Sequence, residues 1–233
     1  MAASRRIPRG LWVAIIAFAA ATGAMQRAQA AELGFYVAGH YGQAKFGGVD
    51  KTRFDDYATF VYSVYGFTPE QTTSTIGDDK DASFGMAAGY RLFPNLAIEG
   101  GYVDLGELTY RNDSFGTHID HQEPWFQKLS ASTSGIALSA LGVLPLSYRW
   151  EIYARGGVLF ATNEVDIYIT DFFGADSLTV SESSTELLAG VGASFSFAEV
   201  YSARFEYQRV FDAGGGLAEG DIDVMSIGFT VHF

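Results

Sequence analysis

The sequence predicts an all-β fold: an eight-stranded antiparallel up-and-down transmembrane β-barrel with short periplasmic turns and long extracellular loops. Three observations support this prediction. Segments that alternate apolar and polar residues with the period of a β-strand occur eight times. Most of the connections between them are alternately long and short, as in a barrel meander. After residue 30 no apolar run approaches the length of a spanning helix, so only a closed barrel could satisfy the backbone hydrogen bonds of the mature chain in lipid.

The first thirty residues are predicted to be a cleaved secretory signal. Arg5, Arg6 and Arg9 make a basic start, residues 11–21 are apolar, and residues 28–30 have the small residues that signal peptidase requires. The apolar run falls short of the roughly 20 residues of a spanning helix, so a retained anchor is the less favoured alternative. The predicted domains are a signal peptide over residues 1–30 and one barrel over residues 31–233.

The charge and the cysteine content of the chain limit the classes of molecule that it could bind. The full chain has 15 Lys and Arg against 27 Asp and Glu, and the predicted signal contains four of the basic residues and no acid. A strongly acidic exported protein is a poor candidate for binding nucleic acid or anionic lipid surfaces. The chain contains no cysteine, so disulfides and thiol chemistry are excluded.

The last strand illustrates the pattern best. Its alternate residues are apolar, and small or polar residues lie between them, which gives the strand one apolar face. The apolar residues are Met225, Ile227, Phe229, Val231 and Phe233. The strands are predicted, in chain order, at residues 33–46, 82–92, 96–110, 131–144, 150–166, 186–197, 201–211 and 225–233. The apolar faces of the first seven carry, in the same order, Phe35 and Tyr41, Phe84 and Tyr90, Ile98 and Tyr102, Ile136 and Leu138, Trp150 and Phe160, Leu187 and Val191, and Tyr201 and Phe205.

The connections divide into two classes. Tight turns are predicted at residues 93–95, 145–149 and 198–199, and longer loops at residues 47–81, 111–130, 168–180 and 213–220. A barrel with this arrangement has one rim toward the periplasm and the other toward the cell exterior. We therefore expect a bacterial outer-membrane protein of a Gram-negative cell, with extracellular loops and both termini in the periplasm.

The spacing of outward aromatic residues favours lipid over water around the barrel. Trp150 and Phe160 lie ten residues apart, as do Tyr201 and Phe211. Ten residues at roughly 3.3 Å each, tilted by about 40–45°, rise about 24 Å, which is close to the height of the apolar band of a membrane barrel. A soluble barrel would place its apolar residues inside. Here glycines, serines and charges share the face opposite the apolar rows.

Several motifs resemble one known family. Residues 89–102 (GYRLFPNLAIEGGY) with Leu105 and Gly106, residues 152–157 (IYARGG) and residues 204–208 (RFEYQ) resemble the outer-membrane protein A type of eight-stranded barrel. The resemblance implies insertion by the barrel assembly machinery, which reads an aromatic C-terminal strand, here through Phe229, Val231 and Phe233. Larger members continue into a peptidoglycan-binding domain; this chain ends at the eighth strand, so that function is not expected here.

Four charged residues are predicted to point into the barrel: Glu99, Arg155, Arg204 and Glu206. An unpaired charge in a narrow interior is costly, so we expect a luminal ion-pair network, with Glu99–Arg204 as the first choice. In relatives a second pair connects the fourth and sixth strands, and the matching residues here, Leu141 and Ser194, predict its absence. The network could be a plug or gate; a structural polar core is the favoured interpretation, because so narrow an interior excludes a continuous pore.

No catalytic, metal or cofactor site is predicted. The histidines are His40, His118, His121 and His232, and no nucleophile–base arrangement can be recognised around them. His118 and His121 with Glu123 could bind a metal, but such spacing in a polar loop is more simply explained by solvated surface residues. Asp55-Asp56 and Asp78-Asp79 could keep a loop soluble or bridge divalent cations to lipopolysaccharide, and the outward Arg209 could contact a phosphate or snorkel.

The predicted function is structural: a barrel with a charged, plugged lumen that supports envelope integrity and contacts outer-membrane lipid and lipopolysaccharide. The alternatives are an adhesin or host-interaction protein that binds a cell-surface ligand through loops 47–81 and 111–130, and a porin-like narrow channel for small solutes. The first loop contains an unusual aromatic cluster, residues 57–67, which is either an interaction surface or a loop packed on itself.

Overall fold

The computed structural model describes residues 33–47, 50–77, 79–118, 120–170, 174–213 and 220–233. The predicted signal peptide, residues 1–30, lies outside the described residues. The elements are β1 (Gly34–Phe46), α2 (Lys51–Tyr65), β2 (Phe67–Ile76), β3 (Lys80–Phe93), β4 (Leu96–His118), β5 (His121–Pro145), β6 (Trp150–Thr170), β7 (Ala175–Ser196), β8 (Tyr201–Ala213) and β9 (Gly220–His232).

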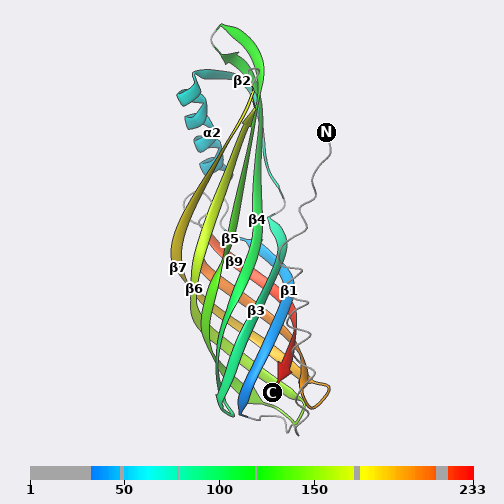
Figure 1. The fold of residues 1–233 in the computed structure, drawn as a ribbon. Helices are drawn as coiled ribbons and strands as arrows, with labels where there is room; N and C mark the ends of the chain where they lie inside the picture. The colour runs from blue at the N-terminus through cyan, green and yellow to red at the C-terminus, as the bar shows by residue number, and fades with distance from the viewer. Residues whose placement is uncertain (1–32, 48–49, 78, 119, 171–173, 214–219) are drawn as a thin grey trace.

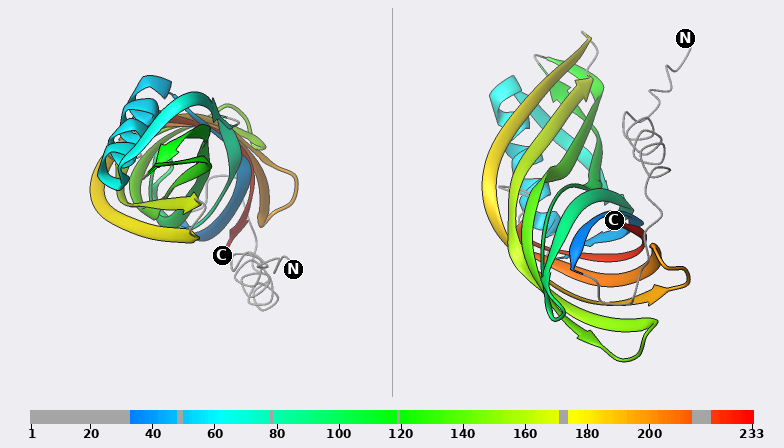
Figure 2. Two further views of the ribbon diagram at one scale, coloured as in Figure 1. Left: turned by 90° about the horizontal axis from the view of Figure 1, so that it is seen from above. Right: turned by 60° about the horizontal axis from the view of Figure 1, so that its bottom comes forward.

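Eight of these strands form a closed ring, which confirms the predicted fold class. β1 pairs with both β3 and β9, and the pairing of β4 with β5 completes the circle; all neighbours are antiparallel. Seen from above, the strands surround one axis (Figure 2). The turns β3–β4, β5–β6 and β7–β8 gather at one end, the short-turn end, near the C-terminus (Figure 1).

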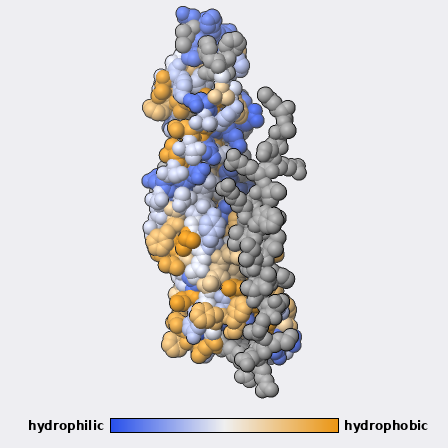
Figure 3. Space-filling model, in the orientation of Figure 1, coloured by the Kyte–Doolittle hydropathy of each residue, from blue (hydrophilic) through white to orange (hydrophobic). Residues whose placement is uncertain are grey.

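The outer face of the ring carries an apolar band. Phe35 is 67% exposed and Ile227 66% exposed, whereas Leu159 on the inner face is fully buried. In Figure 3 the hydrophobic residues of the visible face gather on its lower half, toward the short-turn end. The band ends at outward polar residues such as Gln43 and Thr162. Exposed apolar side chains in a continuous belt are stable only in contact with lipid. Among the described residues, no helix is long and apolar enough to cross a membrane.

Inner glycines make room for large side chains on neighbouring strands. Gly89 is the cross-strand partner of Tyr36, and a Cβ on Gly89 would lie 2.2 Å from the Tyr36 ring. Gly192 is placed in the same way opposite Tyr153, with a clash at 2.4 Å. Because an eight-stranded barrel is only just wide enough for its side chains, each large inner residue needs a small neighbour.

The prediction of long loops at residues 47–81, 111–130 and 168–180 was wrong. β4 runs on to His118 and β5 begins at His121, and β6 and β7 together cover most of 168–180. A hairpin can continue beyond the membrane into water when its residues suit a strand. Residues 175–186, rich in Ser and Thr, do so.

A β-bulge hid the continuation of β4. The β4–β5 register shifts between Asp104 and Glu107, where Gly106 has φ +85° and its N–H donates to Asp104 Oδ1. Before the bulge the buried residues of β4 are odd-numbered, as at Glu99; after it they are even-numbered, as at Tyr110. A strict period of two therefore fails at this point, although the inner face continues without interruption.

The first long connection folds as a helix and a strand. Asp50 caps α2 by accepting a hydrogen bond from the Thr52 N–H, and Gly66, with φ 70°, ends it in the left-handed conformation. α2 then buries one face, Phe54, Ala58, Val61 and Tyr62, and β2 adds to the edge of β4. Within the aromatic cluster, Tyr62 packs on Phe67 and both pack on Trp125 of β5, whereas Phe60 is exposed. We call α2, β2 and the parts of β4–β7 beyond the band the extension.

The outward face of the band predicts a sharp response to charge. Ile227→Arg should destabilise the protein by about 2–4 kcal/mol, because arginine near the membrane midplane is costly, whereas Gln43→Arg on the neighbouring strand at the rim of the band should cost about 0–1 kcal/mol. Urea unfolding in lipid vesicles measures both. Equal stability of the two variants would contradict a lipid-facing position for Ile227.

Candidate functional site

The four charged residues singled out in the sequence meet inside the barrel. Glu99 Oε2 lies 2.6 Å from Arg155 Nη2, and Glu99 Oε1 lies 2.7 Å from Arg204 Nη1. Arg155 Nε lies 2.7 Å from Glu206 Oε1. We call these four side chains, from β4, β6 and β8, the charged network. Glu99 connects two arginines and Arg155 connects two glutamates, so the network is a chain with equal numbers of each charge.

Two tyrosines complete the charged network. The Tyr36 hydroxyl donates to Glu99 at 2.8 Å, and the Tyr153 hydroxyl donates to Glu206 at 2.6 Å. The guanidinium of Arg204 also lies over the Tyr153 ring, 4.6 Å from its centre. Since the Glu99 side chain is only 1% exposed, its charge depends on these partners rather than on water.

The barrel contains a second buried ion pair, which was not predicted from the sequence. Arg91 Nη1 on β3 lies 2.9 Å from Glu151 Oε1 on β6, and Arg91 also donates to the Pro94 carbonyl. The alternation count places both residues inside, so the signal was present. Leu141, at one of the two positions that carry a second pair in relatives, packs in an apolar cluster with Tyr36, Ala97, Val143 and Tyr153.

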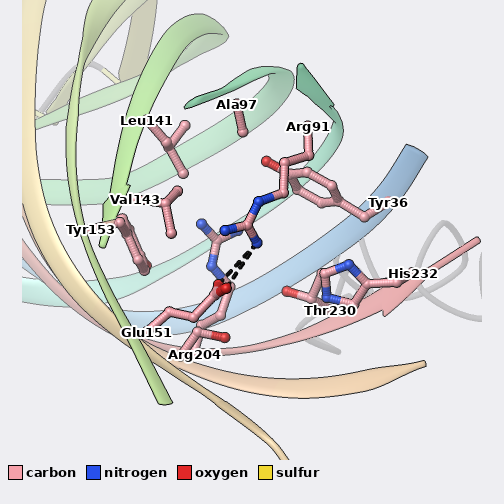
Figure 4. Close-up of a pocket in the computed structure, with 11 residues that line it drawn as sticks. Tyr36, Arg91, Ala97, Leu141, Val143, Glu151, Tyr153, Arg204, Thr230 and His232 are labelled. Carbon is pink, nitrogen blue, oxygen red and sulfur yellow. Dashed lines mark hydrogen bonds and ion pairs between the residues drawn. The ribbon is translucent and has the colours of Figure 1, made fainter. Parts of the chain in front are cut away.

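The space around these pairs is small. One cavity of about 40 Å³ is lined by Arg91, Glu151, Arg204, Thr230 and His232 among others (Figure 4), and a second of about 30 Å³ lies beside His40 and the charged network. Cavities of this size hold one or a few water molecules, not a solute. His232 Nε2 lies 3.2 Å from the Ser202 hydroxyl.

An apolar layer fills the interior beyond the charged network, on the side of the extension. Its members are Leu105, Leu159, Leu188, Val210 and Ile222, and none is more than 3% exposed. This layer was not predicted, although the alternation of the strands points these residues inward. Because these buried side chains pack against one another inside the ring, the geometry disfavours the channel alternative.

The apolar layer continues under α2 as one core. Leu108, Tyr110, Trp125 and Leu129 on the inner face of the extension belong to the same cluster as Leu105 and Leu159. Rings from three elements pack together: Trp125 lies 5.0 Å from Phe67 and 6.1 Å from Tyr62, measured between ring centres. The extension is therefore joined to the barrel interior by continuous packing.

Hydrogen bonds hold α2 against β4. The Tyr110 hydroxyl donates to Asp55 Oδ1 at 2.7 Å, and the Tyr62 hydroxyl donates to Asn112 Oδ1 at 2.7 Å. Burial and the hydrogen bond to Asp55 raise the pKa of Tyr110 to about 12. Burial opposes ionisation of Asp55, but hydrogen bonds from Lys51, Ser74 and Tyr110 hold the pKa of its carboxyl below the ordinary value.

The His118 and Glu123 pair is not solvated, which corrects the surface interpretation for these two residues. His118 Nδ1 lies 2.7 Å from Glu123 Oε1, and both side chains are buried beside Trp125 because they lie on the inner face of the β4–β5 hairpin. His121 and Asp120 are exposed at the turn. Within the described residues, no group of three or more potential ligands is arranged to hold a metal ion.

Arg209 faces outward, as predicted, but its partners lie within the chain. Its Nε and Nη2 lie 2.6 and 2.9 Å from the two carboxylate oxygens of Asp223, to which the Tyr207 hydroxyl also donates. The phosphate contact and the snorkelling of Arg209 stay predictions. Of the paired acids, Asp55 binds Lys51 and Tyr110, and Asp78 lies outside the described residues.

The three residues expected to carry the assembly signal lie on the outer face near the short-turn end. The Phe229 ring lies 5.5 Å from that of Tyr201, and Val231 is the cross-strand partner of Val37 and Tyr201. Phe233 is 57% exposed, and its N–H donates to the Phe35 carbonyl. Their role in assembly stays a prediction.

Comparison with known proteins gives one family match. The model of the outer membrane protein beta-barrel domain matches residues 14–233. Among curated protein sequences nothing matches.

Solved structures with a similar chain course include three barrels. Neisserial surface protein A is 18% identical, with a TM-score of 0.49 over 85% of this chain and 97% of that one. Ail of Yersinia pestis, in complex with the heparin analogue sucrose octasulfate, is 13% identical, with a TM-score of 0.42 over 87% and 99%. The N-terminal barrel of OprF from Pseudomonas aeruginosa is 12% identical, with a TM-score of 0.45 over 87% and 100%.

The charged network predicts a strong effect of removing one charge. Glu99→Gln leaves two buried guanidinium groups against one carboxylate and should destabilise the barrel by about 3–5 kcal/mol in urea unfolding. Glu99→Leu combined with Arg204→Leu removes a balanced pair and should recover most of this loss. A Glu99→Gln protein as stable as the unchanged chain would contradict the network as a source of stability.

The Tyr110 hydroxyl predicts an alkaline loss of α2 docking. Since its pKa is raised, its contribution is complete below the ordinary tyrosine value of about 10 and is lost as the pH rises through about 12. Fluorescence of the buried Trp125, recorded in a Trp150→Phe background, should shift to the red across this range. Tyr110→Phe should make the shift smaller and should weaken docking at pH 7 by about 1 kcal/mol. An identical alkaline shift in both proteins would rule out a contribution of Tyr110.

Proposed function

The chain belongs to the outer membrane protein beta-barrel domain family, and from this premise we propose that it is a non-conducting barrel that displays a folded binding platform outside the cell. The platform is the extension, and its ligand is a molecule on another cell or on a host surface. The proposal develops the adhesin alternative, which the sequence raised for loops 47–81 and 111–130.

One observation carries this proposal: the extension is a folded unit whose packed core continues from the barrel interior. β4 and β5 continue beyond the outward residues that end the apolar band, and β6 and β7 accompany them. α2 covers part of the inner face of this sheet and buries Phe54, Val61 and Tyr62 there. A barrel that only had to close a membrane needs short loops, whereas a packed sheet gives loops a fixed shape for recognition.

The orientation follows from the two ends of the barrel. In outer-membrane barrels the short turns face the periplasm and the long connections face the exterior. By this rule the turns β3–β4, β5–β6 and β7–β8 are periplasmic, together with the C-terminus, and the extension is extracellular. Transfer to this compartment requires export, for which residues 1–30 are the proposed signal peptide.

The closed lumen supports the same proposal. The charged network and the apolar layer fill successive levels of the interior, and the cavities between them are too small for solutes. A barrel that does not conduct is available to act as an anchor. No catalytic role forms part of this proposal.

Envelope support, which the sequence favoured, is retained as a second candidate. The charged network and the Arg91–Glu151 pair link β3, β4, β6 and β8 across the interior, so the barrel is braced against deformation. A rigid barrel in contact with lipopolysaccharide would strengthen the outer leaflet. Insertion by the barrel assembly machinery through Phe229, Val231 and Phe233 is proposed for either role.

A trimmed chain separates the two functions. Removing residues 50–76, 110–129 and 164–181, each replaced by a short glycine-serine turn, deletes most of the extension but keeps both interior layers. We expect the trimmed protein to insert and to remain closed in planar bilayers, because the charged network and the apolar layer are unchanged. Cells carrying it should lose adhesion to surfaces and to other cells that the full chain confers.

The same cells provide the control measurements for envelope support and for conductance. Resistance to detergent, compared between cells with the full, trimmed or deleted gene, reports envelope support independently of adhesion. Adhesion that the trimmed chain retains in full would remove the platform proposal, and a stable large open state of the full chain would remove the closed anchor.

A further inference from the structure

Among the residues that the structure describes, no strand covers either of the two outer edges of the sheet of the extension. β7 pairs with β6 from Ala175 to Phe195, but its pairing with β8 begins only at Leu188. Residues 175–187 of β7, the edge segment, therefore have pairing partners on one side only. The other edge is β2, which pairs with β4 alone. The backbone N–H and C=O groups on an uncovered edge can receive another strand.

The two edges differ in how they are protected. β2 contains Pro69, and its register shifts at that position, so both a proline and a bulge interrupt its edge. The edge segment contains neither proline nor glycine nor lysine, and no register shift occurs in its pairing with β6. It thus lacks a proline, a bulge and a lysine, and the charged residues that could oppose pairing at this edge are all acids.

The inner face of the edge segment has a defined pattern. Leu178 is the cross-strand partner of Ile167, and Val180 that of Val165. Ile167 is 7% exposed in the core, whereas Leu178 and Val180 are 59% and 50% exposed. Asp176 and Glu182 lie on the same face at alternate positions on either side of this apolar pair, so the face presents acid, Leu, Val and acid in a row.

Charge identifies the kind of partner. From residue 156 to residue 203 the sequence has several acids and no lysine or arginine. A second copy is a poor partner: antiparallel pairing centred on Thr179 would place Asp176 opposite Glu182, and parallel pairing in register would place each acid beside its copy. Like charges directly opposite one another destabilise a sheet.

We propose that the edge segment binds an extended basic segment of another protein by strand addition. The bound strand carries lysine or arginine at two outer positions, beside Asp176 and Glu182, and apolar residues at the two alternate positions between them, beside Leu178 and Val180. Backbone hydrogen bonds supply affinity and the alternate side chains supply specificity. This inference rests on the proposed binding function and names its partner.

The test uses the full chain in lipid nanodiscs and a short fluorescent peptide with lysine at both ends and valine at two alternate central positions. We expect saturable binding that weakens with salt. Asp176→Lys with Glu182→Lys should weaken binding about tenfold or more, because two ion pairs at the edge become repulsions. The control Asp56→Lys with Glu164→Lys makes the same change of net charge on α2 and on the other face of β6, and should leave affinity nearly unchanged.

A second peptide separates strand addition from simple charge attraction. N-methylation of alternate peptide bonds removes the backbone donors but keeps every side chain, so it should abolish binding. Equal binding of the methylated peptide, equal loss in both charge variants, or dimers of the chain that cross-link through the edge segment would each overturn the inference. Extension-dependent adhesion that persists in the Asp176→Lys, Glu182→Lys protein would overturn this inference and leave the proposed function standing.

Discussion

Closure of the backbone hydrogen-bond ladder is the constraint on which the rest of this structure depends. In lipid every N–H and C=O must find a partner within the protein, so the pairing of β4 with β5 and of β1 with β9 must leave no edge. Closure with eight strands then fixes the width of the interior. Tyr36 opposite Gly89 and Tyr153 opposite Gly192 follow from that width, because the interior has room for one large side chain at each such position but not for two.

The same constraint explains why the extension is an open sheet, whereas the part of the chain in the membrane is a closed barrel. Once the strands leave the apolar band, water can satisfy an uncovered edge, and closure is no longer required. β8 and β9 do not extend far beyond the apolar band, while β4–β7 continue as an open sheet to which β2 adds. The free edge of β7 is thus a direct consequence of one half of the barrel outgrowing the other. An edge of this kind could not exist within the membrane.

Sequence reasoning recovered the barrel because lipid imposes a simple pattern. The outward rows of all eight strands, and the inward positions of Glu99, Arg155, Arg204 and Glu206, follow from a period of two, which a closed sheet in lipid preserves strictly. The pairing of Glu99 with both arginines does not follow from that pattern. Strand alternation shows whether a side chain points into the barrel, but not its height along the barrel axis relative to side chains on other strands. Arg91–Glu151 and the apolar layer could have been predicted, because the same count points their members inward.

The extension was missed for two physical reasons. The bulge at Gly106 shifts the phase of β4 by one residue, so a fixed alternation places Tyr110 and Asn112 on the wrong face. The helix α2 is the second reason. Its residues are largely aromatic and β-branched, types with modest helix propensity, so the helix depends on its packing against Trp125 and Tyr110 in addition to its caps.

The apolar and polar faces of the strands exchange sides where the sheet passes from lipid into water. On β5 the outward residues pass from Leu138 and Ile136 to Ser134, Ser132 and Ser130, while the inward residues pass from Ser139 to Leu129 and Trp125. On β6 the outward row changes in the same way, from Phe160 to Thr162 and Glu164. In lipid the outer face must be apolar and the inner face can be polar; in water the preference is reversed. The reversal requires that the inner face of the extension be covered. α2 covers the part over β4 and β5, and the part that it leaves open, at Leu178 and Val180, is where a partner strand would complete the core.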